Sequence, residues 1–248
     1  MTVKPVLKKL EDDRHSGRKL LAVLMDPDVY REEAQIRHMA DLCNAHRVDL
    51  ILVGGSLIAG GDLGGLIGHL KQYTTLPVIL FPGSYMYFHP SADALLFLSL
   101  ISGRNPEYLI GQHVVAAPFV RGSGLEVIPT GYILVGDKAS TTVAYISHTL
   151  PIPGSKSDVA ACTAMAGEML GMKIIYLDAG SGAPDPVPTE MISVVREKID
   201  LPLWVGGGIN SPEKAAAAWD AGADLIVLGN GLQDDPRLLI GLDELRAG

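Results

Sequence analysis

Two oxygen-bearing side chains follow neighbouring apolar runs of this sequence and have the chemistry of magnesium ligands. Asp26 comes directly after the run at 20–25, and Ser56 follows the run at 49–54. Mg2+ is held by few protein groups and completes its shell with water and phosphate oxygens, so this pair predicts a magnesium site. The alternative for Asp26 is to cap the next helix, but Asp28 lies closer to the start of that helix and is the predicted cap.

Glycine-rich segments follow the last three apolar runs, at 178–182, 206–210 and 229–231. Glycine lets backbone N–H groups approach a ligand closely, and a helix that begins after such a segment favours an anion at its N-terminus. One glycine pair would indicate only a tight turn. Three such segments in succession predict a site for a phosphate monoester.

Two further features suit a larger substrate. Arg104 can clamp a phosphate with two parallel N–H donors, although it also fits an exposed loop arginine. The aromatic stretch at 85–88 stands beside the apolar run at 94–100 and would suit a hydrocarbon chain. The alternative for this stretch is local packing of a short connection.

The elements that position these residues are short apolar runs separated by helical segments. Because the runs lack polar alternation, we predict strands buried on both faces of a parallel sheet. The eight predicted strands are 20–25, 49–54, 77–81, 94–100, 126–135, 173–178, 201–205 and 224–229. A predicted helix within 29–47 has one apolar face, formed by Ile36, Met39, Ala40 and Cys43. The connection 83–93 is short and contains a proline, so a loop or single turn is expected there instead of a helix.

This alternation predicts one α/β domain over residues 1–248, a (β/α)8 barrel of the TIM type with an abbreviated third helix, in preference to a doubly wound sheet. In such a barrel the active site lies at the C-terminal ends of the strands. Every segment named above follows a strand, so all of them are expected on one rim.

Composition excludes several classes of protein. The 248 residues are 48% hydrophobic and carry a net charge of −8, which argues against a nucleic-acid binder. The two cysteines, Cys43 and Cys162, are too few for a disulfide framework, which predicts a reducing, cytoplasmic location. Each is expected to be a small buried apolar group. The longest apolar stretch, 94–101, is far shorter than a bilayer-spanning helix. We therefore expect no transmembrane segment. Transient contact with a membrane is compatible with this expectation.

The chain from about residue 20 to 245 resembles the geranylgeranylglyceryl phosphate synthase family. The segments that carry the resemblance are LMDPD, LILVGGS, LFPGS, LFLSLISGRNP, IPTGYILV, IYLDAGSGAP, LWVGGGINSPEKA and AGADLIVLGNG. The joint pattern of YLDAGSG, GGGI and GN with DPD and GGS is specific, whereas GGGI alone is common among phosphosugar barrels. The resemblance implies a Mg2+-dependent prenyltransferase, which joins geranylgeranyl diphosphate to the 3-hydroxyl of sn-glycerol 1-phosphate in ether lipid biosynthesis.

Carried over residue by residue, the resemblance places the metal at Asp26 and Ser56 and the proton-accepting base at Asp178. It implies a glycerol 1-phosphate site at Tyr176, Leu177, Asp178, Ala179, Gly180, Ser181, Gly182, Gly207, Gly208, Gly229 and Asn230. Arg104 is expected to stabilise the departing diphosphate. The family commonly has glutamate at the position of Asp178, which is one methylene shorter.

The same resemblance bears on assembly. Leu24 stands where some members have lysine, which indicates the branch of longer and often hexameric members. An aromatic residue near Tyr145 commonly anchors a subunit interface in the family. A homo-oligomer is therefore expected, a hexamer in preference to a dimer. The competing functions are a phosphosugar isomerase or lyase on the same barrel and a non-catalytic carrier of prenyl phosphates.

Overall fold

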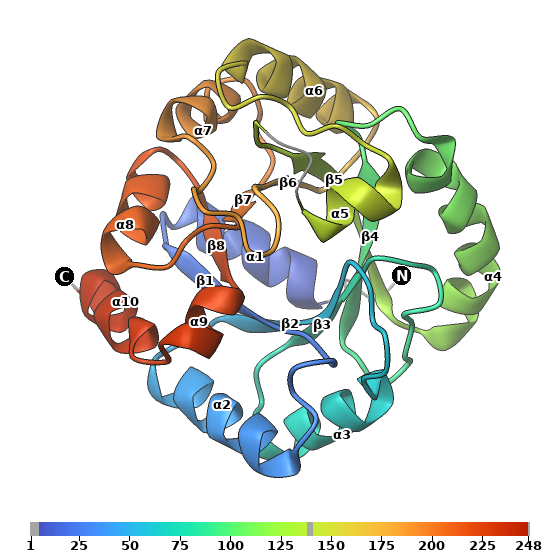
Figure 1. The fold of residues 1–248 in the computed structure, drawn as a ribbon, viewed down its shortest axis with the longest axis vertical. Helices are drawn as coiled ribbons and strands as arrows, with labels where there is room; N and C mark the ends of the chain where they lie inside the picture. Colours follow the sequence, from blue (N-terminus) through green and yellow to red (C-terminus); the bar gives the residue numbers. More distant parts are fainter. Residues whose placement is uncertain (1–4, 138–140, 248) are drawn as a thin grey trace.

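The computed structural model describes residues 5–137 and 141–247, which form a closed barrel of eight parallel strands surrounded by helices (Figure 1). The strands pair in chain order, and the first pairs with the last. Their bounds are β1 Leu20–Met25, β2 Leu50–Gly55, β3 Val78–Pro82, β4 Ala94–Leu100, β5 Glu126–Leu134, β6 Ile174–Asp178, β7 Leu203–Gly206 and β8 Leu225–Leu228. The predicted barrel is confirmed, and each predicted strand differs from the observed one by at most two residues at either end.

Helices cover the outside of the barrel. They are α2 Glu33–Ala45, α3 Leu63–Tyr73, α4 Gln112–Ser123, α5 Thr142–Ser147, α6 Ser157–Met169, α7 Thr189–Arg196, α8 Pro212–Asp220, α9 Asn230–Asp234 and α10 Leu238–Ala247, with the short π-helical turn η1 Glu107–Gly111 before α4. The predicted face of α2 is buried, with Ile36, Met39, Ala40 and Cys43 against the sheet. Within 83–93, between β3 and β4, the chain forms a loop without a helix, as its proline and short length predicted.

Two local predictions are wrong. Glu32, not Asp28, occupies the N-cap position of α2 and makes no side-chain cap bond. Asp28 instead accepts hydrogen bonds from the backbone N–H groups of Ala59 and Gly60, at 2.6 and 2.9 Å, and so ties the loop after β2 to the loop after β1. Cys162 is exposed, because it lies on the outward side of α6, while Cys43 is buried.

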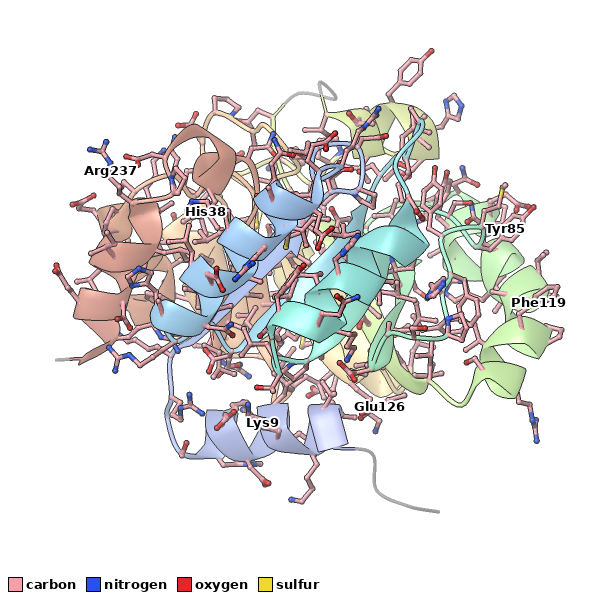
Figure 2. The ribbon with its side chains drawn as sticks, turned by 90° about the horizontal axis from the view of Figure 1, so that it is seen from below. Lys9, His38, Tyr85, Phe119, Glu126 and Arg237 are labelled. Carbon is pink, nitrogen blue, oxygen red and sulfur yellow. The ribbon has the colours of Figure 1, made fainter. Side chains whose placement is uncertain are left out.

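The end of the barrel opposite the predicted site is closed by α1, Pro5–His15. Its Val6 and Leu10 pack on the barrel interior, and the Glu126 carboxylate accepts the N–H groups of Val6 and Leu7, both at 3.0 Å. Figure 2 shows α1 lying across this end, with Glu126 above it. This face therefore has a stabilising role.

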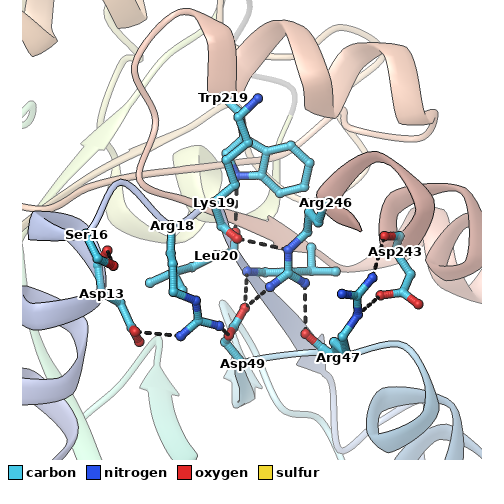
Figure 3. A network of polar contacts seen from close by, with 11 residues as sticks. Asp13, Ser16, Arg18, Lys19, Leu20, Arg47, Asp49, Trp219, Asp243 and Arg246 are labelled. Atoms are coloured by element: carbon cyan, nitrogen blue, oxygen red, sulfur yellow. Dashed lines mark hydrogen bonds and ion pairs between the residues drawn. The ribbon is translucent and has the colours of Figure 1, made fainter. Parts of the chain in front are cut away.

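A polar network on the same face binds the C-terminal helix to the first two strands (Figure 3). The Asp49 carboxylate accepts from Arg18 at 2.8 Å, from Arg246 at 2.6 Å and from the Leu21 N–H at 2.9 Å. Arg246 also donates to the carbonyls of Lys19 and Arg47. Because the Asp49–Arg246 pair is buried and fully hydrogen-bonded, removal of either partner would leave an uncompensated buried charge.

In the described part of the chain, every helix is too short or too polar to span a bilayer.

Candidate active site

A polar cavity opens at the C-terminal ends of the strands, where the predicted residues meet. Strands β1, β2, β6, β7 and β8 end at its walls. The predicted residues that line it are Asp26, Ser56, Tyr176, Asp178, Gly180, Ser181, Gly182, Gly207, Gly208, Gly229 and Asn230. The predictions for the two halves of the rim therefore converge on one cavity.

Three predicted residues do not line this cavity. Side chains alternate across a strand, so Leu177, between Tyr176 and Asp178, points outward into the core beneath the helices, and Ala179 is buried in that same core. Arg104 is exposed and donates to the carbonyls of Ile101 and Gly103, at 3.4 and 2.7 Å. Its predicted contact with diphosphate stays a prediction that this side-chain conformation does not support.

Glycine is required at the contact between the β6 and β7 loops. Gly207 and Gly208 have φ of +78° and +69°, a region that other L-residues rarely adopt. A Cβ at Gly207 would lie 2.7 Å from Asp178 Oδ1 and 2.7 Å from the Gly180 nitrogen. The hydroxyl of Ser181 donates to Asn230 Oδ1 at 2.9 Å and so joins the β6 loop to the residues after β8. The three glycine-rich segments thus form one continuous wall with accessible backbone.

The charge of the cavity is unusual for a site that would hold phosphate. Among the described residues that line it, Asp26 and Asp178 carry charge and none is a lysine or arginine. An anion bound here must be neutralised by backbone N–H groups and by something from outside the chain. A metal ion meets that need, because it supplies the largest local positive charge in such sites.

Asp178 is buried and held at both oxygens. The Tyr132 hydroxyl donates to its Oδ2 at 2.6 Å, and the Gly180 N–H donates to its Oδ1 at 2.7 Å. Burial raises the pKa of Asp178, while these two hydrogen bonds act in the opposite direction. Burial and the nearby Asp178 charge raise the pKa values of Tyr132 and Tyr176 well above their ordinary range. The site therefore offers one oriented carboxylate among neutral hydroxyl groups, as a general base requires.

Sequence reasoning did not find Tyr132. It lies inside β5, where an aromatic residue is indistinguishable from a core residue. The barrel register pairs Tyr132 with Tyr176 on β6, and the Tyr132 hydroxyl extends from there to Asp178, 46 residues away in the sequence. No spacing rule connects positions so far apart.

Tyr132→Phe is expected to move the acid limb of the pH–rate profile to higher pH. Burial raises the pKa of Asp178 and the Tyr132 hydrogen bond lowers it, so loss of this hydrogen bond raises that pKa further. Activity that needs ionised Asp178 would then fail at a higher pH than in the wild type. Profiles of kcat/KM for the two proteins check this, and a limb that stays in place or moves to lower pH contradicts the coupling.

Asp26 and Ser56 lie together on the other wall. The Asp26 Oδ2 lies 3.0 Å from the position that a Cβ on Gly55 would take, directly before Ser56. The Asp28 N–H donates to Asp26 Oδ1 at 2.8 Å, and burial is the main cause that raises the pKa of Asp26. The described residues contain no group of three His, Cys, Asp or Glu side chains able to hold a metal without help. This donor set fits Mg2+, which takes one or two protein oxygens and fills its shell with phosphate and water.

A second cavity, lined mostly by apolar side chains, adjoins the first. Its walls are the aromatic loop after β3, strand β4, α4 and α5, and it shares Gly55, Ser56, Phe81 and Tyr132 with the polar cavity. Tyr85, Tyr87 and Phe88 of the predicted aromatic stretch line it, whereas Met86 points to solvent. The predicted apolar groove therefore exists, and it meets the polar cavity at Ser56 and Tyr132.

A (β/α)8 barrel with glycine-rich loops after strands 6 to 8 and a buried carboxylate at the same rim is typical of phosphate-binding barrel enzymes. The chain belongs to the PcrB family, whose profile matches residues 15–245. It is 53% identical to geranylgeranylglyceryl phosphate synthase of Spirosoma linguale, over 93% of this chain and 92% of the relative. It is 41% identical to the Pyrococcus abyssi protein of that name, over 96% and 95% of the two chains.

A solved structure agrees with this assignment. (S)-3-O-geranylgeranylglyceryl phosphate synthase from Thermoplasma acidophilum, in complex with sn-glycerol-1-phosphate, superposes with a TM-score of 0.90 at 32% identity, and the match covers 98% of both chains. The family predicted from sequence is confirmed, and the chain is an enzyme of that family.

Proposed function

We propose that this enzyme transfers a geranylgeranyl group from geranylgeranyl diphosphate to the 3-hydroxyl of sn-glycerol 1-phosphate, with Mg2+ as cofactor. The observation that carries the proposal is the junction of a polar cavity, containing an oriented buried carboxylate, with an apolar cavity. The names of the relatives and the glycerol phosphate bound to the Thermoplasma acidophilum enzyme support it further. The products are geranylgeranylglyceryl phosphate and diphosphate.

In the proposed reaction, the glycine-rich wall holds the acceptor phosphate and the apolar cavity holds the prenyl chain. Asp26 and Ser56 would hold Mg2+, which stabilises negative charge on the departing diphosphate. The bond between C1 of the donor and the diphosphate oxygen breaks, and the acceptor hydroxyl oxygen bonds to C1. Asp178 accepts the hydroxyl proton, while Tyr132 keeps its carboxylate oriented.

The test is incubation with labelled sn-glycerol 1-phosphate and geranylgeranyl diphosphate, with and without Mg2+. A lipid-soluble labelled phosphate that forms only with both substrates and the metal is the expected result. A phosphosugar isomerase or lyase would consume no prenyl donor, and a carrier would bind the donor without releasing diphosphate. Either outcome would overturn the proposed transfer.

We also propose a homo-oligomer, a hexamer in preference to a dimer, and a cytoplasmic location, for which the free thiols of Cys43 and Cys162 are the support. Tyr145 lies on the short helix α5, and 77% of its surface is exposed. Leu150, nearby in the sequence, is also exposed. Residues 138–140, just before this helix, lie outside the described part of the chain.

Tyr145→Ala is expected to yield smaller particles than the wild type in sedimentation velocity, because it removes the largest exposed apolar side chain of α5. Tyr85→Ala, at an exposed tyrosine on the loop after β3, is the matched control and should leave the mass unchanged. An unaltered mass for Tyr145→Ala would refute the anchor, and a monomeric wild type would refute the oligomer.

A further inference from the structure

Lys214 contacts the glycine-rich wall of the polar cavity from behind. It lies in the first turn of α8, and its Nζ donates to Asn210 Oδ1 at 2.9 Å and to the Gly208 carbonyl at 3.4 Å. Both acceptors belong to residues that line the cavity, whereas Lys214 itself lies outside the lining. Because both acceptors are neutral oxygens, neither cancels the positive charge of the ammonium group.

The stability of α8 does not explain this position of a lysine. The partial positive charge at a helix N-terminus favours acidic side chains and disfavours basic ones. Glu213, in the same turn, follows this rule, and the Ser211 hydroxyl caps the helix by accepting the Lys214 backbone N–H at 3.3 Å. The helix therefore has its cap and its acidic residue without the lysine side chain, whose ammonium group turns back to the loop after β7.

The Lys214 contact fixes the orientation of the Asn210 carboxamide. An ammonium group has three donors and no acceptor, so the Asn210 atom that faces it must be the amide oxygen. The NH2 group of Asn210 is thereby turned away from Lys214. Because Asn210 lines the polar cavity, its N–H donors are available to a ligand there.

Asn230, on the adjacent loop, is held in the same way. Its Oδ1 accepts the Ser181 hydroxyl at 2.9 Å, and a Cβ on Gly182 would lie 3.9 Å from its Nδ2. The two asparagines belong to neighbouring segments, since a Cβ on Gly231 would lie 3.3 Å from the Asn210 Cα. Each carboxamide thus has its oxygen bound by the protein and its nitrogen directed elsewhere as a donor, an arrangement that suits an anion and not a cation.

We propose that Asn210 donates its NH2 group to the phosphate of the acceptor and that Lys214 is the positioning residue that holds it in this orientation. The inference rests on the proposed function, because it takes sn-glycerol 1-phosphate as the occupant of the glycine-rich wall. The charged residues in the described lining of the cavity are Asp26 and Asp178, so phosphate bound at this wall depends on neutral donors. A hydrogen bond to a charged group is stronger than one between neutral groups, so one more carboxamide donor has a measurable effect.

The alternative is that the Lys214–Asn210 contact only fixes the loop after β7. Asn210→Asp separates the two roles, because aspartate still accepts the Lys214 hydrogen bond but offers no donor and adds a negative charge. A contact that only fixes the loop would survive this substitution, whereas a hydrogen bond to phosphate would not.

The experiment is calorimetric titration of the full chain with sn-glycerol 1-phosphate and, separately, with inorganic phosphate, both without prenyl donor. Asn210→Asp and Asn210→Ala should each weaken the binding of both anions by about tenfold or more, the usual effect of losing a hydrogen bond to a charged group. Lys214→Met should weaken it less, by about fivefold, because the released carboxamide can still rotate toward the phosphate.

Two control variants accompany these titrations. Lys214→Arg should bind both anions as the wild type does, because a guanidinium group is also a donor without an acceptor. Lys19→Met removes the same charge at the opposite end of the barrel, where the Lys19 Nζ donates to Asp220 at 2.9 Å, and it should also match the wild type.

Wild-type affinity of Asn210→Asp overturns the phosphate contact. So does weaker binding of glycerol 1-phosphate with unchanged binding of inorganic phosphate, because Asn210 would then contact the glycerol hydroxyls. If Lys214 acts through Asn210, Lys214→Met has no further effect in the Asn210→Ala background, and an equal effect there overturns the positioning role.

Prenyl transfer is assayed separately on the same proteins. If the variants lose anion binding as expected but the wild type transfers no prenyl group, the proposed function alone is overturned. If the wild type transfers the group and the variants bind both anions as it does, this inference alone is overturned.

Discussion

Asp178→Asn is expected to lower turnover by about 10²–10⁴-fold while glycerol 1-phosphate still binds, since that is the usual contribution of a well-placed general base. Asparagine keeps the volume of the side chain, can accept the Gly180 N–H with its Oδ1 and can donate its NH2 group to the Tyr132 hydroxyl oxygen, but it cannot take the proton of the acceptor hydroxyl. The measurement is kcat and KM for both substrates, together with calorimetric binding of glycerol 1-phosphate.

Asp178→Glu is the matched control, because it keeps the basic group and introduces the residue that the family resemblance leads us to expect at this position. It should retain substantial turnover. If Asp178→Asn instead raises KM for glycerol 1-phosphate with kcat unchanged, the carboxylate orients the acceptor and is not the base.

The raised pKa of Asp178 gives this variant a second expected result. A carboxyl whose pKa is higher in the folded than in the unfolded state stabilises the fold when it is protonated. That contribution is present at low pH and is lost as the pH rises from the unfolded pKa through the folded one. Asp178→Asn mimics the protonated form, so near neutral pH its free energy of unfolding should equal or exceed that of the wild type. A lower value would show that the charged form stabilises the site.

Asp26→Asn is expected to reduce turnover at limiting Mg2+ by about 10²-fold or more, because Lewis-acid stabilisation of a leaving group is worth several kcal/mol. Asp26 is the carboxylate beside Ser56 in the polar cavity, where the described lining residues include no cation. Excess Mg2+ should restore part of the activity. The Mg2+ dependence of kcat/KM and Mn2+ binding in the presence of diphosphate, followed by electron paramagnetic resonance, are the measurements.

Asp28→Asn is the control that distinguishes loss of the metal ligand Asp26 from damage to the turn after β1. Asp28 lies two residues away, and its carboxylate faces the Ala59 and Gly60 N–H groups outside the cavity. This variant should keep the wild-type Mg2+ dependence. Near wild-type activity of Asp26→Asn at limiting Mg2+ would refute the metal site.

The sequence by itself determined the barrel and the rim on which its chemistry lies. Both follow from local patterns: apolar runs without alternation indicate strands buried on both faces, and the polar or glycine residues after each run must fall at the carboxyl end of a parallel sheet. Asp26 and Ser56 were found in this way, whereas the role of Asp178 came from the family resemblance, and all three line the polar cavity. The absence of a helix after β3 was also predicted from a local pattern, because a short segment with a proline cannot form a full crossover helix.

Only the tertiary structure decided which side chains meet. The Tyr132–Asp178 contact and the junction of the two cavities join segments that are distant in the chain. The sequence patterns also did not predict the outward direction of Leu177 or the hydrogen bonds of the exposed Arg104 to its own loop. A periodic pattern gives the face on which a residue lies, but the stagger and tilt with which eight strands close a barrel set the pairing between strands. That closure is a property of the whole chain, so a local pattern cannot supply it.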